Sequence, residues 1–393
     1  MKNSFYKILT ISLLVLTVGL IAQAQTSRFK SLVGEIQSVQ KQFVPDKRVA
    51  ILDISLNDTL KPIITLKGET NLPEGKIAII KLLKTKGIQF VDSIRVLPDA
   101  ALGDKIWGLA TLSVSSMRSK PDHAAEMITQ ALMGTPLKVL DFKDGWYRVQ
   151  TPDYYLGWMD GRGLKRLTSA ELDRWKKSNR YVYNRITGNA FVSSNRKSWP
   201  VTDLVMGDLL EVEAVGNGFL KIRIPDSRIG FVKKSDCLSW HKWTGQKPDV
   251  KAIIAVAKQL MGVPYLWGGT SCKEVDCSGM TKTAYFSQGI ILARDASQQA
   301  RYGEHPDFND LQSLLPGDLL FFGRSAQRIT HVGLYLGNDK YINAAGLVCI
   351  NTVNPKAPDF TTSDRKDLVA AGRIMNSLNT EGIILVKDHP WYK

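Results

Sequence analysis

The chain has 393 residues and a formal net charge of +15, with 44% hydrophobic and 23% charged residues. This composition excludes a wholly disordered chain, and the length allows two to four domains with separate cores. Its 4 cysteines are too few for a fold held together by disulfides. The positive charge indicates an anionic partner, such as nucleic acid, an acidic membrane face or the cell wall.

The first 24 residues are predicted to be a secretory signal peptide. Lys2 and Lys7 form a basic start, Ile8 to Ala22 is an uncharged and mostly apolar run, and Ala22-Gln23-Ala24 matches a cleavage site. The run is short for an uncleaved anchor. We therefore expect a periplasmic or secreted protein with no stable membrane insertion, and export disfavours nucleic acid as a partner. Cleavage removes two lysines and no acidic residue, so the net charge falls from +15 to +13.

The next segment, residues 25–104, is predicted to be a small α+β domain. The expected elements are a helix over 32–43, strands over 49–55 and 63–67, a helix over 74–85 and a strand over 88–96. One face of the helices would then cover one sheet. No reactive side chains converge in this segment, so we expect packing or binding from it rather than catalysis.

Residues 107–239 contain an internal repeat with a constant offset of 73 residues. The recurring residues are Gly134, Leu137, Val139, Gly145, Pro152, Asp153 and Gly157, which return as Gly207, Leu210, Val212, Gly218, Pro225, Asp226 and Gly230. Short alternating strands between glycine and Pro-Asp turns predict a small β-barrel in each copy. Between the copies, Thr168 and Glu171 have the spacing of a capping box that opens a short helix.

Cys277 stands where a turn-rich segment meets an apolar, helix-like run, Met280 to Phe286. A cysteine at a helix N-terminus faces unpaired backbone N–H groups and the positive end of the helix dipole. Both favour the thiolate, which would make Cys277 an ionised nucleophile. Taken alone, this residue favours the alternative of a buried and inert cysteine, so further residues must decide.

A nucleophilic cysteine needs a base, and the pattern favours His331. Of the 5 histidines, the other four lie in polar or turn-like segments, whereas His331 begins a strand pattern over 331–337. A preceding strand pattern over 316–322 can pair with it. Asn343 lies on the next short strand, where its side-chain oxygen can accept the imidazole N–H. Cysteine, histidine and asparagine form a known variant of the catalytic triad.

Six motifs around these residues resemble the NlpC/p60 cysteine peptidases, papain-like enzymes that cut cell-wall stem peptides. In chain order they are PYLWGG, DCSG, RDASQQ, PGDLLFF, HVGLYLG and YINAAG, between about Asp249 and Met375. The resemblance implies that Cys277 is the nucleophile, His331 the base and Asn343 the residue that orients the imidazole. Histidine is common at this third position, so Asn343 is a variation. The resemblance requires no metal or other cofactor.

The repeat resembles bacterial SH3-like domains, because its GWYRV segment is typical of their closing hairpin. The predicted fold class is therefore an α+β multidomain chain. Its expected segments are a signal peptide (1–24), a small N-terminal α+β domain (25–104), a first SH3-like barrel (105–166), a helical joint (167–179), a second SH3-like barrel (180–240), a linker (241–248) and a papain-like α+β NlpC/p60 domain with a C-terminal tail (249–393). Asp249 is expected to cap the first helix of the last domain.

An exported chain of this organisation resembles the γ-D-glutamyl-L-diamino-acid endopeptidases, which cleave muropeptides with a free N-terminal L-Ala. In those enzymes the first SH3-like domain caps the cleft and helps to hold the substrate's ammonium group. The substrate-binding residues implied here are Glu126, Tyr155 (with Tyr154 as the alternative), Asp276, Ser278 and Ser297. Tyr265 resembles a family position near the thiol, and it is either a hydroxyl donor to the substrate or a packing residue.

The repeat gives a separate reason to favour the first barrel. Tyr155 corresponds to Arg228 at the offset of 73 residues, and a guanidinium group would repel an ammonium group. We therefore expect peptidoglycan stem peptides or muropeptides as partners. The alternatives are a wall-binding protein without catalysis and another papain-like amidase or acyltransferase.

Overall fold

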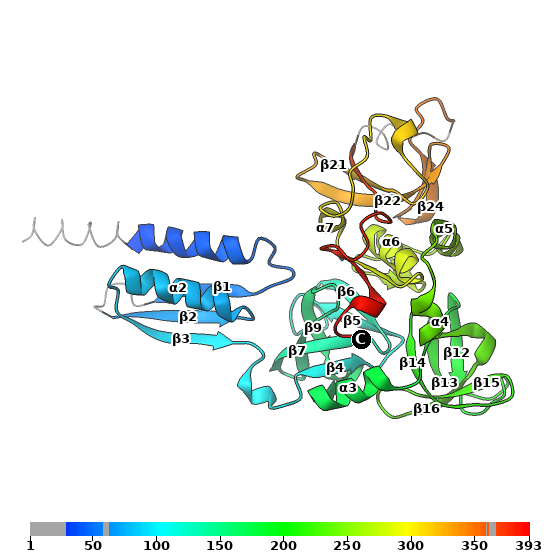
Figure 1. The fold of residues 1–393 in the computed structure, drawn as a ribbon, viewed down its shortest axis with the longest axis horizontal. Helices are drawn as coiled ribbons and strands as arrows, with labels where there is room; N and C mark the ends of the chain where they lie inside the picture. Colours follow the sequence, from blue (N-terminus) through cyan, green and yellow to red (C-terminus); the bar gives the residue numbers. More distant parts are fainter. Residues whose placement is uncertain (1–28, 58–62, 359, 361–366) are drawn as a thin grey trace, which may run out of the picture. The chain divides into compact units, whose positions relative to one another are not determined.

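The computed structural model describes residues 29–57, 63–358, 360 and 367–393. The predicted signal peptide lies outside these described residues. The chain separates into two compact units, Met1–Ala101 and Leu102–Lys393 (Figure 1). None of the helices in the described ranges is both long and apolar enough to cross a membrane.

The first unit is a three-stranded sheet with helices packed on it. Residues 29–43 are helical, and they are followed by β1 (Leu52–Asn57), β2 (Ile64–Thr70), α2 (Pro73–Thr85) and β3 (Phe90–Val96). Strand β2 pairs antiparallel with β1 and parallel with β3, so α2 is the crossover helix between parallel strands. Proline in the first turn of α2 favours a helix start, and Ile79 and Leu83 give the helix its buried face.

A seven-stranded sheet opens the second unit. Its strands are β4 (Trp107–Ala110), β5 (Val114–Arg118), β6 (Met127–Leu132), β7 (Pro136–Lys143), β8 (Trp146–Gln150), β9 (Leu156–Asp160) and β10 (Leu164–Leu167), in the spatial order β10-β4-β7-β8-β9-β5-β6. Alternate residues of these strands, among them Leu137, Val149 and Met159, are fully buried in one core. The alternating sequence pattern thus matches a sheet with one buried face.

A second seven-stranded sheet follows the short helix α3 (Ser169–Lys177). Its strands are β11 (Arg180–Tyr183), β12 (Thr187–Phe191), β13 (Pro200–Val205), β14 (Leu209–Val215), β15 (Phe219–Arg223), β16 (Ile229–Lys233) and β17 (Cys237–Ser239), in the order β17-β11-β14-β15-β16-β12-β13. Strand for strand, this is the order of the first sheet, so the repeat in the sequence is also a repeat of topology. The predicted capping box between Thr168 and Glu171 is confirmed at the start of α3.

The two sheets are joined at equivalent turns. The backbone N–H of Leu209 donates to the Met133 carbonyl at 2.9 Å, and the Met133 N–H donates to the Asp208 carboxylate at 3.1 Å. Burial raises the pKa of Asp208 well above its usual value, against the opposing effect of the N–H donors of Val205 and Met133. These contacts link the turns around Gly134 and Gly207, the first pair of residues in the repeat.

The last domain packs helices against a five-stranded sheet. Its elements are α4 (Trp240–Gly245), α5 (Val250–Gln259), β18 (Thr270–Ser271), β19 (Glu274–Val275), α6 (Cys277–Phe286), β20 (Ile290–Leu292), α7 (Ala296–Gln299), β21 (Leu319–Gly323), β22 (Ile329–Gly337), β23 (Lys340–Ala345), β24 (Leu347–Thr352), β25 (Leu368–Gly372) and β26 (Ile383–Leu385), with the sheet order β24-β23-β22-β21-β25. Asp249 caps α5 through the N–H groups of Lys251 and Ala252, as predicted.

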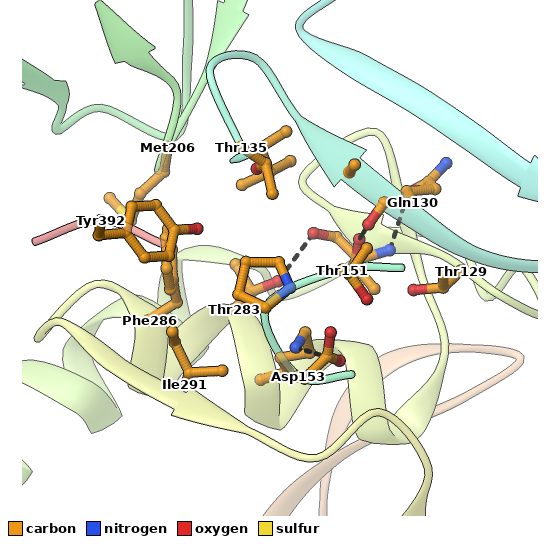
Figure 2. Close-up of a pocket in the computed structure, with 15 residues that line it drawn as sticks. Thr129, Gln130, Thr135, Thr151, Asp153, Met206, Thr283, Phe286, Ile291 and Tyr392 are labelled. Atoms are coloured by element: carbon orange, nitrogen blue, oxygen red, sulfur yellow. Dashed lines mark hydrogen bonds and ion pairs between the residues drawn. The ribbon is translucent and has the colours of Figure 1, made fainter. Parts of the chain in front are cut away.

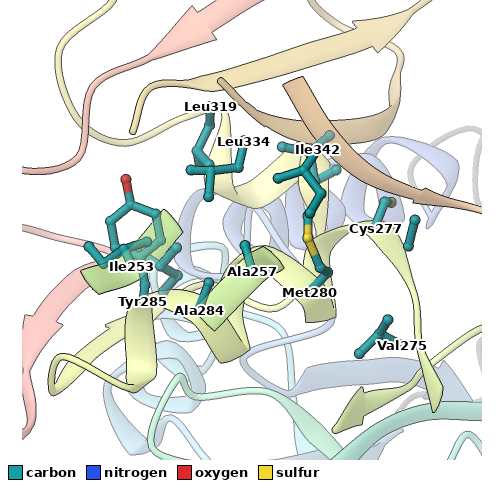
Figure 3. Packing of buried hydrophobic residues seen from close by; sticks show 14 of the residues in the cluster. Ile253, Ala257, Val275, Cys277, Met280, Ala284, Tyr285, Leu319, Leu334 and Ile342 are labelled. Atoms are coloured by element: carbon teal, nitrogen blue, oxygen red, sulfur yellow. The ribbon is translucent and has the colours of Figure 1, made fainter. Parts of the chain in front are cut away.

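Helix α6 is the central helix of this domain, and it packs against β22 and β23. Figure 3 shows Met280 and Ala284 of α6 in the buried cluster with Leu334 and Ile342 of the sheet. Cys277 belongs to the same cluster. The hydrophobic core therefore fixes the position of the first turn of α6 relative to the strands that carry His331 and Asn343.

Candidate active site

Cys277 is the first residue of α6. Asp276 caps this helix, because its carboxylate accepts the backbone N–H of Gly279 at 2.7 Å. The predicted helix N-terminus at Cys277 is thereby confirmed. Cys277 is 5% exposed, and the backbone N–H groups of Val332 and Ser278 lie close enough to its sulfur to act on the pKa of the thiol. Since Val332 follows His331 on β22, the sulfur lies beside the strand that carries the expected base.

His331 and Asn343 lie on neighbouring antiparallel strands. As predicted, β22 pairs with β21, and His331 lies opposite Phe322. On its other side, β22 pairs with β23. The Nε2 atom of His331 is 2.9 Å from the Oδ1 atom of Asn343, whose side chain is buried. One ring nitrogen is therefore held by the amide, and Nδ1 is the other site for a proton.

The protonation state of Cys277 differs from the expected thiolate. Burial raises the pKa of its thiol to about 11, and the negative charge of Asp276 adds to this rise, whereas the Val332 and Ser278 N–H groups act in the opposite direction. The loss of hydration thus outweighs the effect of the helix N-terminus. The thiol is the resting form at neutral pH, and its ionisation requires a proton acceptor at the sulfur.

Asp276 and Ser278 belong to a buried ionic network around Arg294. The Arg294 guanidinium donates to Asp276 Oδ1 at 3.1 Å, to Asp276 Oδ2 at 2.5 Å and to Ser278 Oγ at 2.9 Å. Asp276 is 4% exposed and Arg294 is 1% exposed. The charge of Asp276 is therefore balanced within the protein. Sequence reasoning missed Arg294, because nothing local in RDASQQ shows that its side chain points inward.

Tyr155 reaches the peptidase-like domain from the loop between β8 and β9. Its side chain is buried, and its hydroxyl donates to Asp295 Oδ2 at 2.9 Å. The neighbouring Tyr154 has a φ of 63°, is 41% exposed and packs against Trp391 near the C-terminus. The structure therefore brings Tyr155, rather than Tyr154, to the RDASQQ segment. Asp295 is a second residue that sequence reasoning missed, although it lies inside a quoted motif.

Glu126 makes a second contact between the first barrel and this domain. It is exposed, and its carboxylate accepts the indole N–H of Trp267 at 2.8 Å. Nearby, the backbone N–H of Thr270 donates to the Gln130 side chain at 2.8 Å. Trp267 and Thr270 belong to the segment that leads to Cys277. The first barrel thus lies against both the PYLWGG and the RDASQQ segments.

Tyr265 and Ser297 complete the set of expected residues. Burial raises the pKa of Tyr265 to about 12, and the negative charges of Asp276 and of the ionised form of Cys277 act in the same direction, so the phenol remains protonated at neutral pH. Ser297 is half-buried on α7, a helix that contacts β22. The structure therefore brings Tyr265 near the thiol and places Ser297 two residues after Asp295.

A separate cavity lies between the first seven-stranded sheet, the second seven-stranded sheet and α6 (Figure 2). Its lining is mainly apolar atoms and hydroxyl groups, from residues such as Thr151, Met206 and Phe286. Asp153 and Lys282 also line it, and they form an ion pair at 2.6 Å. None of Cys277, His331 and Asn343 is among its lining residues. This cavity is therefore a different place in the molecule from the expected catalytic site.

All four cysteines lie in the part of the chain that the structure describes, and none forms a disulfide. Burial raises the pKa of Cys237 to about 12 and that of Cys272 to about 11, with smaller contributions from neighbouring acidic side chains. These two residues are protonated thiols at neutral pH. Neither is placed at the first turn of a helix beside a histidine.

Comparison with known proteins agrees with this arrangement. Residues 262–363 match the NlpC/P60 family, and residues 117–164 match the bacterial dipeptidyl-peptidase Sh3 domain. A γ-D-glutamyl-L-lysine dipeptidyl-peptidase of Bacillus cereus is 30% identical over 236 residues, which is 56% of this chain and 68% of the relative. The chain belongs to the NlpC/P60 family. The predicted family is therefore confirmed, and the Sh3 match lies within the first seven-stranded sheet.

Other similar proteins support this assignment. A γ-D-glutamyl-L-lysine dipeptidyl-peptidase of Bacillus subtilis is 28% identical over 228 residues, which is 55% of this chain and 71% of the relative. The crystal structure of an NlpC/P60 family protein from Bacillus cereus has a TM-score of 0.60 and 22% identity, covering 68% of this chain and 99% of that one. This NlpC/P60 chain and that structure share a fold.

Proposed function

We propose that this NlpC/P60 protein is an exported cysteine peptidase that acts on peptidoglycan stem peptides. The proposed cleavage site is the bond between the γ-carboxyl of D-Glu and the diamino acid, in muropeptides with a free N-terminal L-Ala. The observation that carries the proposal has two parts: the Cys277 sulfur faces the N–H of Val332, and the ring of the preceding residue, His331, is held by Asn343 at 2.9 Å. The relatives named γ-D-glutamyl-L-lysine dipeptidyl-peptidases support the choice of bond.

In the proposed mechanism, the raised pKa of Cys277 makes His331 a general base. Nδ1 of His331 takes the thiol proton as the sulfur attacks the γ-glutamyl carbonyl, and the carbonyl oxygen becomes an oxyanion. The N–H of Cys277 at the helix start and the protonated Tyr265 hydroxyl are the proposed donors to this oxyanion. His331 then gives its proton to the departing amine as the carbon–nitrogen bond breaks. The γ-glutamyl group remains on Cys277 as a thioester.

Water completes the cycle. His331 removes a proton from water, and the hydroxide attacks the thioester carbonyl. The carbon–sulfur bond breaks as the acid product forms, and the sulfur takes the proton from His331, which restores the thiol and the neutral base. Asn343 accepts the Nε2–H of His331 throughout, so it holds the ring plane and stabilises the imidazolium. The products are L-Ala-D-Glu and the peptide that begins with the diamino acid.

The substrate's ammonium group is proposed to bind where the first barrel meets the peptidase domain. Glu126 supplies an exposed carboxylate, and Tyr155 with Asp295 supplies a hydroxyl and a second carboxylate. Asp276 and Ser278 have a supporting role in this proposal, because Arg294 already balances the charge of Asp276. Ser297 borders the same segment. The shared strand order of the two sheets further supports the second sheet as another SH3-like barrel without this role.

The test is to incubate the exported chain with L-Ala-γ-D-Glu-L-Lys, with the diaminopimelate peptide and with intact sacculi, and to identify products by mass spectrometry. We expect release of L-Ala-D-Glu from the free peptides. Cys277→Ala should remove turnover, whereas Cys272→Ala is a matched control that should retain it, because Cys272 lies five residues earlier, outside the site.

Three outcomes would contradict the proposal. Turnover by folded Cys277→Ala protein would exclude the thiol as nucleophile. Wall binding without any product would favour the non-catalytic alternative. Transfer of the acyl group to an added amine, with no hydrolysis, would favour an acyltransferase.

A further inference from the structure

The two ends of the Asn343 amide face different partners. Its Oδ1 atom is 2.9 Å from Nε2 of His331, and its Nδ2 atom donates to Oδ1 of Asn351 at 2.8 Å. Asn351 lies on β24, the strand that pairs with β23 on the side away from β22. The order of contacts across three strands is therefore His331, Asn343 and Asn351.

Strand register explains why Asn351 can reach this amide. Asn343 pairs with Cys349, and Tyr341 pairs with Asn351. Residues 349 and 351 are two apart on β24, so their side chains lie on the same face of the sheet. Asn343, which pairs with Cys349, has its side chain on this face as well. Asn351 is thus a diagonal neighbour of Asn343, at a distance that side chains of this length can bridge.

The orientation of the amide matters for the base. A neutral His331 that accepts the thiol proton at Nδ1 must carry its own proton on Nε2, and the imidazolium formed later also carries that proton. Either form needs an acceptor opposite Nε2. If the amide of Asn343 turned by 180°, an NH₂ group would face the Nε2–H, and two donors would oppose each other without an acceptor between them.

We infer that Asn351 is a positioning residue that fixes the amide of Asn343 with its oxygen toward His331. The inference rests on the proposed function, in which His331 is the base. In the turned orientation, Asn343 would present its oxygen to the oxygen of Asn351 and lose the 2.8 Å hydrogen bond. The two-sided contact therefore disfavours the orientation that catalysis cannot use.

A neighbouring thiol fixes Asn351 in turn. The Cys349 thiol donates to Oδ1 of Asn351 at 3.2 Å, so this oxygen accepts from two donors, Asn343 and Cys349. A turned Asn351 would present its NH₂ group to both donors. The chain of contacts thus has one favoured orientation for each amide.

The test separates the acceptor of Asn351 from its bulk. Asn351→Leu keeps the approximate size and removes the acceptor, whereas Asn351→Asp keeps an acceptor oxygen. We expect Asn351→Leu to lower kcat at least about tenfold with KM little changed, and Asn351→Asp to stay within about threefold of the parent. Asn351→Ala is the second acceptor-free variant, for use if leucine disturbs folding.

A second background makes the test specific. In Asn343→Asp protein, either carboxylate oxygen can accept the Nε2–H, so no partner is needed to select between two ends. Adding Asn351→Leu to this background should then cause no further loss of kcat. An equal loss in both backgrounds would overturn the inference, because it would indicate a general structural role.

A readout without turnover distinguishes this inference from the proposed function. The ¹⁵N shifts of labelled histidine, assigned with His331→Ala protein, should report His331 as the Nε2–H tautomer in the parent and a mixture in Asn351→Leu. An unchanged tautomer in Asn351→Leu would overturn the inference even if the parent cleaves peptide. A tautomer change in a protein that cleaves no stem peptide would support the inference and contradict the proposed function.

Discussion

The hydroxyl group of Tyr155 is one point at which the first SH3-like domain contacts the RDASQQ segment. It donates to Asp295, and Arg294 and Asp276 follow in the same buried network. The adjacent Tyr154 points to the C-terminal segment instead. Two neighbouring tyrosines therefore form a matched pair, of which one lies at the proposed ammonium site and the other does not.

At this scale we predict a difference between Tyr155→Phe and Tyr154→Phe. Loss of the Tyr155 hydroxyl removes a hydrogen bond to a carboxylate, so KM for the free-amine peptide should rise about five- to tenfold. The Tyr154 variant should resemble the parent. Steady-state kinetics with free and N-acetylated L-Ala peptides give the measurement. Equal rates on the two peptides in the parent, or equal effects of the two variants, would exclude an ammonium site at Tyr155.

Among the elements, one of the turns repeated at an offset of 73 residues, the turn at Gly134, is also a contact point between the two sheets. Gly134 has a φ of +75°, and a Cβ atom there would lie 2.8 Å from the Cβ of Leu209 in the second sheet. Gly145, in another turn of the first sheet, has a φ of +84° with nothing within 4 Å of such an atom. Both positions strain an L-residue, but only Gly134 also lies against the neighbouring sheet.

This contrast predicts unequal effects of the same substitution. Gly145→Ala should lower the free energy of unfolding by about 1–2 kcal/mol, which is the cost of the left-handed conformation. Gly134→Ala should cost about 1–3 kcal/mol more, because the methyl group collides with Leu209. Urea titration of both variants checks the difference. Equal losses would show that the sheets separate without cost at this turn.

For the second unit as a whole, the C-terminal segment ties the peptidase domain to the first barrel. The Nε2–H of His389 donates to the Pro152 carbonyl at 2.9 Å, and Nδ1 accepts the N–H of Trp391 at 3.2 Å. Trp391 packs edge-on against Trp107 of β4, and the Tyr392 side chain is buried. Pro152 lies three residues before Tyr155, so the segment supports the loop that carries this tyrosine.

His389 predicts a pH dependence of stability. Burial lowers its pKa from 6.5 to about 4, in spite of the raising effects of the Pro152 carbonyl and Asp153. The unfolded chain therefore binds the proton first as the pH falls, and stability is lost between pH 6.5 and about 4, by at most about 3 kcal/mol. Above pH 6.5, His389 is neutral in both the folded and the unfolded chain, and no stability is lost to its protonation.

The measurement is the Tm of the parent and of His389→Asn between pH 7 and 4. Asparagine can donate and accept at the same positions without titrating, so its Tm should fall less over this window. The exposed His241→Asn is the matched control and should follow the parent. Parallel curves for all three proteins would exclude His389 as the titrating group.

Features that depend on near neighbours in the chain could be predicted from the sequence. The helix starts at Asp249, Thr168 and Asp276 follow from side chains that cap N–H groups two or three residues away. The strands of His331 and Asn343 follow from alternation and short turns. The motif order around Cys277 indicated the NlpC/P60 family, which the comparisons confirm.

Contacts between distant segments were decided by the tertiary structure alone. Arg294 balances Asp276, Tyr155 rather than Tyr154 reaches Asp295, and Asn351 meets the amide of Asn343. The pKa of the Cys277 thiol is raised rather than lowered as the helix N-terminus suggested, because burial depends on all the segments that pack around the start of α6. A local pattern specifies the residue and its element, whereas desolvation and ion pairing depend on which other segments fold against it.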